Sequence, residues 1–155
     1  MFGAHPPRHK SGNCIKSLNG HTDWVRSLVL TSDEQTLISA SDDKTIKIWC
    51  LQSNKVRVTL DSHSHYVNAL ALAQDNQTLI SASHDKTIKI WNLRNGNLIK
   101  TLSGHKDAVR TLQLTNDDQI LITTDIYDIR YWNIKSGELI RDPVESKNPI
   151  VSCLI

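Results

Sequence analysis

The chain has 155 residues, of which 39% are hydrophobic and 22% are charged, so it is long enough for one globular domain with a buried core. Its 18 basic and 16 acidic residues give a formal net charge of only +2, which argues against a nucleic-acid partner and against attraction to an anionic membrane. No apolar run reaches the roughly 18 residues of a membrane span. The three cysteines are widely spaced, odd in number and in no ligand-like pattern, so we expect reduced thiols in a cytoplasmic protein. We also expect no cofactor.

Residues 1–13 are expected to form a flexible N-terminal tail. They contain Pro6-Pro7 and have no apolar stretch that could serve as a secretion signal. His5, His9 and Cys14 are the one candidate metal-binding group in this part of the chain. Their spacing fits no standard zinc pattern, so we expect no metal site.

Beyond the tail, short runs rich in Val, Ile, Thr and Leu alternate with turn residues. Such runs predict β-strands, and the short polar side chains between them favour tight turns. The first four strands are predicted at Val25–Thr31, Thr36–Ser41, Thr45–Leu51 and Val56–Leu60. The same scheme recurs along the chain, and no segment has the period and length of a helix. The sequence therefore predicts an all-β protein of four-stranded antiparallel sheets.

The recurrence is regular enough to define an internal repeat. Residues 35–49 and 77–91 agree at 14 of 15 positions and differ only where Asp42 is replaced by His84. The histidines at positions 21, 63 and 105 are spaced by 42 residues, and the tryptophans at 49, 91 and 132 follow at 42 and 41. Three tandem units are predicted, at about residues 19–60, 61–102 and 103–144, within a repeat region of residues 14–145.

These units resemble the repeats of the WD-repeat (WD40) family. The resemblance is carried by Gly20-His21 and Gly104-His105, by the two SASxDKTIKIW blocks, and by tryptophans followed by Cys or Asn where the family most often has Asp. It implies blades of a β-propeller, in which four-stranded sheets are arranged radially. The predicted fold class is therefore all-β, with WD40-type β-propeller blades.

The propeller is expected to be incomplete, with three full blades and edge strands. Residues 14–18 (CIKSL) match the outermost strand of a blade, and residues 146–155 contain a match to the innermost strand of a further blade. Three blades do not close a ring, and their open faces expose apolar surface. We expect either a truncated piece of a longer propeller, which we favour, or a protomer that self-associates through its open blade faces.

The resemblance also implies a buried hydrogen-bonded group of four side chains in each unit. Its members would be an indole, a hydroxyl, an imidazole and a carboxylate, each satisfying the next. They correspond to Trp49, Ser39, His21 and Asp43 in the first unit, to Trp91, Ser81, His63 and Asp85 in the second, and to Trp132, Thr123 and His105 in the third. The third unit lacks one residue, so either Asp125 or Asp128 would supply its carboxylate, and this blade is expected to be looser.

A serine, a histidine and an aspartate in one group are also the residues of a hydrolase active site. A hydrolase needs one unique site with an exposed nucleophile and an oxyanion hole. Here the same set occurs at least twice, in step with the repeat, and each time with a tryptophan. We therefore expect structural groups, no catalytic residue and no enzyme activity.

The function expected from the resemblance is a protein–protein interaction scaffold, within a larger regulatory or signalling protein. The alternative is an enzyme or nucleic-acid binder that uses the blades as a scaffold. Other proteins or peptides are the expected partners, at the end of the propeller that carries the residues around each inner strand. The candidate partner-binding residues, which include types enriched at interfaces, are Trp24, Arg26, Asp42, Tyr66, Asn68, His84 and Arg110. Trp24 and Tyr66 would otherwise only cover neighbouring loops.

Overall fold

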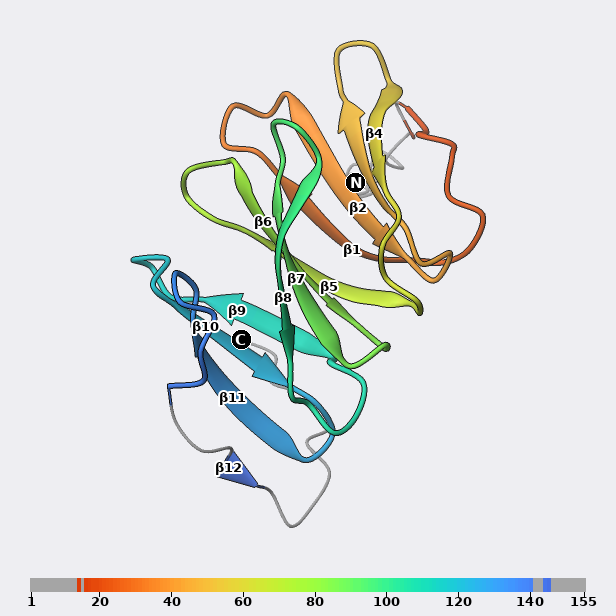
Figure 1. The fold of residues 1–155 in the computed structure, drawn as a ribbon. Helices are drawn as coiled ribbons and strands as arrows, with labels where there is room; N and C mark the ends of the chain where they lie inside the picture. The colour runs from red at the N-terminus through yellow and green to blue at the C-terminus, as the bar shows by residue number, and fades with distance from the viewer. Residues whose placement is uncertain (1–13, 15, 141–143, 146–155) are drawn as a thin grey trace, which may run out of the picture.

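The computed structural model describes residues 14, 16–140 and 144–145. The predicted tail, residues 1–13, and the predicted start of a further blade, residues 146–155, lie outside the described residues. Across the described residues the chain is all β, with three separate four-stranded antiparallel sheets. Figure 1 shows these sheets arranged one after another as an open fan. No helix that is long and apolar enough to cross a membrane occurs in the described part of the chain.

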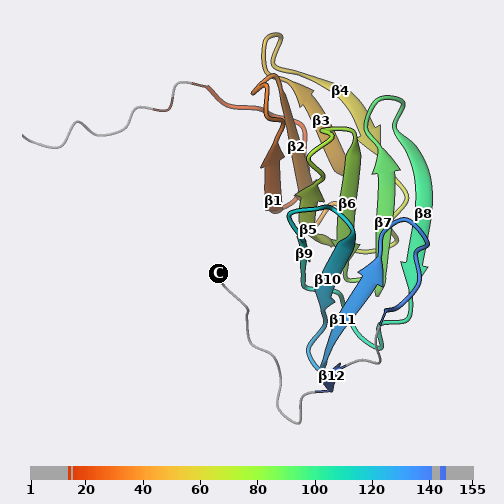
Figure 2. The ribbon, with the colours of Figure 1, turned by 90° about the vertical axis from the view of Figure 1, so that its left-hand side faces the viewer.

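Each sheet is one blade, built from four strands in chain order. The first blade contains β1 (Val25–Leu30), β2 (Thr36–Ser41), β3 (Ile46–Cys50) and β4 (Lys55–Leu60). The second contains β5 (Val67–Leu72), β6 (Thr78–Ser83), β7 (Thr87–Asn92) and β8 (Asn97–Ser103). The third contains β9 (Thr111–Leu114), β10 (Ile120–Thr124), β11 (Asp128–Asn133) and the two-residue β12 (Val144–Glu145). In Figure 2 the inner strands β1, β5 and β9 lie along one side, and the outer strands β4 and β8 lie along the other.

Successive blades pack face to face because side chains alternate between the two faces of each strand. We call the face of a blade toward the preceding blade its leading face, and the face toward the next blade its trailing face. The trailing face of the first blade contributes Ile38, Ala40, Ile46 and Ile48 to the first core cluster, against Val67, Leu70, Leu79 and Trp91 on the leading face of the second. The second cluster repeats this arrangement, with Ile80, Ala82, Ile88 and Ile90 against Val109, Leu121 and Trp132. The core therefore lies between the blades.

One expectation about the edges of the fan differs from the structure. The described residues 14 and 16–18, which match an outermost strand in sequence, form no strand, because no sheet of the described residues lies beside them to supply hydrogen bonds. At the other edge, the third blade is the loosest. The outermost strand of the third blade pairs with β11 only at Asp128 and Ile129, and one isolated bridge joins Trp132 to Leu139. In the first and second blades, by contrast, β4 and β8 pair along their full lengths.

Candidate functional site

The polar residues of the first repeat form one buried chain of hydrogen bonds. The Trp49 indole N–H donates to Ser39 Oγ at 2.7 Å, and the Ser39 hydroxyl lies 2.7 Å from His21 Nε2. His21 Nδ1 lies 2.7 Å from Asp43 Oδ2, and the backbone amide and hydroxyl of Thr45 donate to Asp43 Oδ1. An indole can only donate, so the serine oxygen accepts from Trp49 and donates to Nε2. The imidazole proton is then on Nδ1, directed at the carboxylate.

The second repeat has the same chain with nearly the same distances. Trp91 Nε1 to Ser81 Oγ, Ser81 Oγ to His63 Nε2, and His63 Nδ1 to Asp85 Oδ2 are each 2.8 Å. Because the sequence repeats these four residues at a fixed spacing, the same backbone geometry brings them together twice. The two chains tie the segment before each inner strand to the turn between the second and third strands.

The third repeat keeps the chain, with Asp125 as its carboxylate. Trp132 Nε1 lies 2.8 Å from Thr123 Oγ1, which lies 2.8 Å from His105 Nε2, and His105 Nδ1 lies 3.0 Å from Asp125 Oδ2. The backbone amides of the two residues at 127 and 128 donate to Asp125 Oδ1 at 2.8 and 2.7 Å. The shortened turn therefore moves the acidic residue closer in sequence without breaking the chain.

Asp128, the other candidate for that carboxylate, belongs to a buried ion pair that sequence reasoning missed. Its Oδ2 accepts a hydrogen bond from Arg130 Nη2 at 2.9 Å, and both side chains are buried. Arg130 stands where the first two blades have Lys47 and Lys89, each of which donates to a threonine hydroxyl on the outer strand. The substitution of Asp and Arg at these two positions was visible in the sequence, but only the fold brings both side chains together.

The electrostatics favour ionised carboxylates in all three chains and a neutral imidazole in the third. Burial raises the pKa of Asp43, but hydrogen bonds from Thr45, His21 and backbone amides outweigh it and lower the pKa from 3.8 to about 2. The same balance lowers the pKa of Asp85 and of Asp125. Burial lowers the pKa of His105 despite its bond to Asp125. A neutral His105 beside an ionised Asp125 is consistent with an Nδ1–H that donates to the carboxylate.

The burial of the serines argues against nucleophilic chemistry in these chains. Ser39 is 2% exposed and Ser81 is fully buried, so neither hydroxyl is presented to solvent in the way that an accessible nucleophile would be. Each hydroxyl already accepts from an indole and donates to an imidazole. The arrangement can hold loops in place, and it has the bonding of a structural group rather than of an activated nucleophile.

At the inner edge of the fan, five of the seven candidate partner-binding residues line one hollow of about 370 Å³. The members of this rim hollow come from all three blades: Arg26 from the first, Tyr66, Asn68 and His84 from the second, and Arg110 from the third. Asn68 also donates to the Val109 carbonyl of the next blade at 2.8 Å. The rim hollow therefore exists only because the blades are packed side by side.

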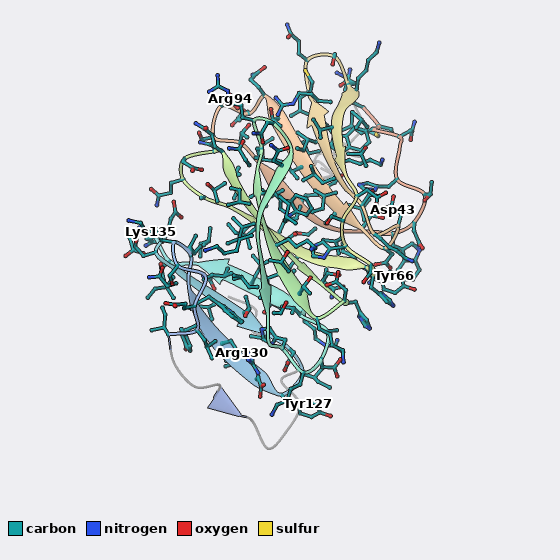
Figure 3. The ribbon with its side chains drawn as sticks, in the orientation of Figure 1. Asp43, Tyr66, Arg94, Tyr127, Arg130 and Lys135 are labelled. Atoms are coloured by element: carbon teal, nitrogen blue, oxygen red, sulfur yellow. The ribbon has the colours of Figure 1, made fainter. Side chains whose placement is uncertain are left out.

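Beside the rim hollow, Trp24 is 71% exposed and Tyr66 is 38% exposed. The Arg26 guanidinium carbon lies 5.1 Å from the centroid of the Trp24 ring, a cation–π distance. Figure 3 labels Tyr66 on the opposite side of the molecule from Arg94 and Lys135, which lie in the turns at the other end of the blades. The indole and the phenol thus supply apolar surface next to charged groups.

Asp42 does not lie where the repeat pattern led us to expect it. Instead of being exposed it is 6% exposed, and its carboxylate is held by the Arg26 guanidinium through two hydrogen bonds, from Nε at 2.8 Å and from Nη2. Ala108, which occupies the place of Trp24 and Tyr66 in the third repeat, is also buried. Asp42, at the one position that differs between the two copied segments, is therefore the ion-pair partner of Arg26 within the first blade.

His65 contributes to the rim and was not predicted. Its ring stacks on His84, with centroids 4.5 Å apart, and meets Tyr66 edge-on at 4.2 Å. Its Nδ1 accepts the Tyr66 amide at 2.9 Å, as the Asp23 and Asp107 carboxylates accept the following amides in the other blades. The sequence did contain this signal, because a histidine interrupts two aspartates at the 42-residue spacing.

An open array of four-stranded blades joined by these Trp–Ser/Thr–His–Asp chains defines an incomplete β-propeller of repeated units. A sequence model described as "WD domain, G-beta repeat" matches residues 12–50, 54–92 and 96–128. The chain therefore belongs to the WD40 family. The three matched segments begin and end at other residues than the three units predicted from the sequence, and the boundaries of those units remain a prediction.

Known proteins resemble this chain over part of their length. It is 58% identical over 40 residues to the nuclear distribution protein PAC1 of Gibberella zeae, which is 26% of this chain and 9% of that protein. It is 40% identical over 55 residues to the pre-mRNA-splicing factor PRP46 of Yarrowia lipolytica, which is 36% of this chain and 12% of that protein. The matched segments thus span about a tenth of these relatives.

Solved structures match over more of the chain. "Structure of U3-55K" and "Crystal structure of RRP9 WD40 repeats" each superpose with a TM-score of 0.79 at 25% identity. Each superposition covers 85% of this chain and 42% of the other. Both comparisons agree with the blade architecture, and WD40 repeats indicate a protein-interaction scaffold.

Proposed function

We propose that this chain is a non-catalytic interaction module whose rim hollow binds an acidic segment of another protein. The observation that carries the proposal is the rim hollow itself, which joins two arginines, a histidine, a tyrosine and an asparagine from three blades. Tyr and Arg are among the residue types that most often anchor protein interfaces. A rigid frame that is held by buried hydrogen-bond chains also limits the entropy lost on binding.

The charges around the rim hollow support an acidic ligand. Arg26 is neutralised by Asp42 within the first blade. In the second blade the matching position holds His84, and in the third the described residues place no carboxylate within ion-pair distance of Arg110. A further aspartate of the pattern, found at positions 23 and 107, is replaced by His65 in the second blade. A carboxylate-bearing segment would give Arg110 the kind of partner that Arg26 has in Asp42 in the first blade.

Fluorescence polarisation with two labelled peptides of equal length, one rich in glutamate and one rich in lysine, tests this proposal. We expect the purified chain to bind the glutamate-rich peptide more tightly, and we expect added salt to weaken the binding. Arg110→Ala should weaken it about ten- to a hundredfold, because a charged hydrogen bond contributes roughly 1.5–3 kcal/mol. Arg94→Ala, which changes an exposed arginine at the other end of the blades, should leave it unchanged. Equal affinity for both peptides, or equal effects of the two variants, would contradict the proposal.

We also propose that the chain works as part of a larger regulatory or signalling assembly in the cytoplasm. The propeller blades offer a rigid surface, and the proposal rests on the scaffold character of WD40 repeats together with the balanced charge of the chain. Expression of the chain with a fluorescent tag, followed by cell fractionation, would test the location.

A further inference from the structure

Within the described residues, the first blade has an uncovered leading face that is built like the covered leading face of the second. Val25 and Leu28 are 49% and 59% exposed, whereas their equivalents 42 residues later, Val67 and Leu70, are 0% and 8% exposed. The same face has a hollow of about 470 Å³ that is lined by Leu37 and Trp49 among others. An apolar face of this kind is usually covered by another protein surface.

At the other end of the fan, no further blade among the described residues packs on the trailing face of the third blade. A hollow of about 230 Å³ there is lined by Gln113, Ile122, Thr124 and Ile129 among others. Ile122 and Ile129 stand where Ile38 and Ile46 of the first blade pack against the second. The face is thus the repeat equivalent of a surface that already receives a leading face.

We infer that two copies of this chain associate head to tail, with the trailing face of the third blade of one copy packed on the leading face of the first blade of the other. Inside one copy, trailing and leading faces of this design already meet twice, between the first and second blades and between the second and third. A second copy supplies the missing trailing face without any new type of contact. This inference is independent of the rim hollow.

Polar contacts in the turns at the ends of the blades also join each trailing face to the leading face of the next blade. The Ser32 amide donates to Asn76 Oδ1 at 2.9 Å across the first interface, and the Gln74 amide donates to Asp118 Oδ2 at 2.8 Å across the second. Asn76 and Asp118 both have positive φ, of 52° and 55°, and the equivalent residue of the first blade, Glu34, has φ 57°. Glu34 therefore offers a carboxylate acceptor beside the uncovered leading face of the first blade.

The matching donor lies on the third blade. The residue equivalent to Ser32 and Gln74 is Asn116, whose carbonyl accepts the Gln74 side chain from the second blade. Its backbone amide occupies the place of the two amides that already donate across an interface. In a head-to-tail pair, Glu34 of one copy accepts this amide of the other, which repeats the existing contact for a third time.

The size of the faces favours a closed pair of copies. A four-stranded face measures roughly 19 by 17 Å, so one contact buries roughly 600 Å² on both sides together. Stable interfaces bury about 1,200 Å² or more, which a pair reaches only when both of its contacts form. Two copies supply six blades, within the range of roughly four to eight in closed propellers.

Sedimentation velocity of the 155-residue chain over a wide concentration range tests the inference. We expect the 17.5 kDa chain to shift to twice its mass as concentration rises. Leu28→Glu should raise the dissociation constant at least about tenfold, because it buries an unpaired carboxylate. Leu98→Glu, at an exposed leucine on the outer strand of the second blade, should leave the association unchanged. A wild-type chain that stays monomeric and binds a hydrophobic dye would overturn the inference.

A second pair of variants distinguishes head-to-tail contacts from contacts between two leading faces. Gln113→Arg on the trailing face should also weaken self-association, although it leaves the leading face intact. An equimolar mixture of Leu28→Glu and Gln113→Arg chains should associate more tightly than either alone, because one wild-type contact forms and the two new charges meet at the other. If Gln113→Arg pairs as well as the wild type, or if the mixture gains nothing, the head-to-tail arrangement is wrong.

Discussion

The hydroxyl group in the middle of each buried chain has two partners at once, which makes it the most sensitive single group in the blade. Ser81 accepts from the Trp91 indole and donates to His63, both at 2.8 Å, and all three side chains are buried. Thr123 makes the same two contacts in the third blade. The hydrogen-bond chain therefore requires a hydroxyl group at this position, which either serine or threonine can supply. Loss of the hydroxyl leaves an indole N–H and an imidazole nitrogen without partners.

Replacing Ser81 by alanine is expected to lower the free energy of unfolding by about 2–4 kcal/mol, because two buried polar groups each lose a hydrogen bond. Urea denaturation followed by tryptophan fluorescence measures the change. Ser62→Ala, at an exposed serine, serves as the matched control and should stay within about 0.5 kcal/mol of the wild type. A Ser81→Ala variant as stable as this control would show that the chain contributes little to folding.

The carboxylates of the chains predict a loss of stability in acid. The pKa of Asp43 falls from 3.8 to about 2 on folding, so the unfolded chain binds more protons than the folded one between these values. The stabilisation is complete above about pH 4 and is lost as the pH falls toward about 2. The lowered pKa values of Asp85 and Asp125 act in the same direction.

This dependence can be measured by urea titrations at a series of pH values. The free energy of unfolding of the wild type should fall steadily below about pH 4, and the slope should be smaller for Asp43→Asn, which has no carboxyl at that position to protonate. The variant is expected to be less stable than the wild type at neutral pH. Equal slopes for the two proteins would show that Asp43 does not hold its proton more weakly in the folded state.

At the scale of strands and blades, the three sheets differ in how well they are covered. The second blade is covered on both faces, whereas the first and third each have one uncovered face within the described residues. The third blade also has a two-residue outer strand. Backbone hydrogen bonds in a blade open less often when apolar packing covers both faces.

Hydrogen exchange should therefore be slowest in the second blade. We expect the amides of β6 and β7 to be better protected than those of β10 and β11, because both faces of the second blade are covered. This order agrees with the looser third blade that the one-residue deletion in the third unit predicts. Exchange monitored by mass spectrometry on peptides from each blade would measure this order. Faster exchange in β6 than in β10 would contradict it.

The strands were predictable because turn residues and β-branched residues alternate at short range. The four strands expected in the first blade match the structure within one residue at each end, and the three Trp–hydroxyl–His sets follow from the fixed repeat. The burial of Asp42 was not predictable in this way, since it depends on the reach of Arg26 across the first two strands. His65 was missed although the interrupted aspartate pattern pointed to it.

At the scale of the whole molecule, a fan of three blades leaves its two end faces to be covered by other surfaces. The repeat itself defines which surfaces fit, because each leading face is copied every 42 residues and each inner contact pairs it with a trailing face. Stability of the fan is therefore coupled to whatever binds these end faces. If a second copy covers them, unfolding must depend on protein concentration.

The thermal midpoint should then rise with protein concentration. Between a concentration near the dissociation constant and one a hundredfold higher, association adds about 2 kcal/mol, which raises Tm by roughly 4–8 °C for a chain of this size. Differential scanning fluorimetry over that range measures the shift. Leu28→Glu, which blocks one face, should have a midpoint that does not change with concentration, whereas Leu98→Glu should follow the wild type. A wild-type midpoint that is constant across the range would mean that the end faces are not covered by a second copy.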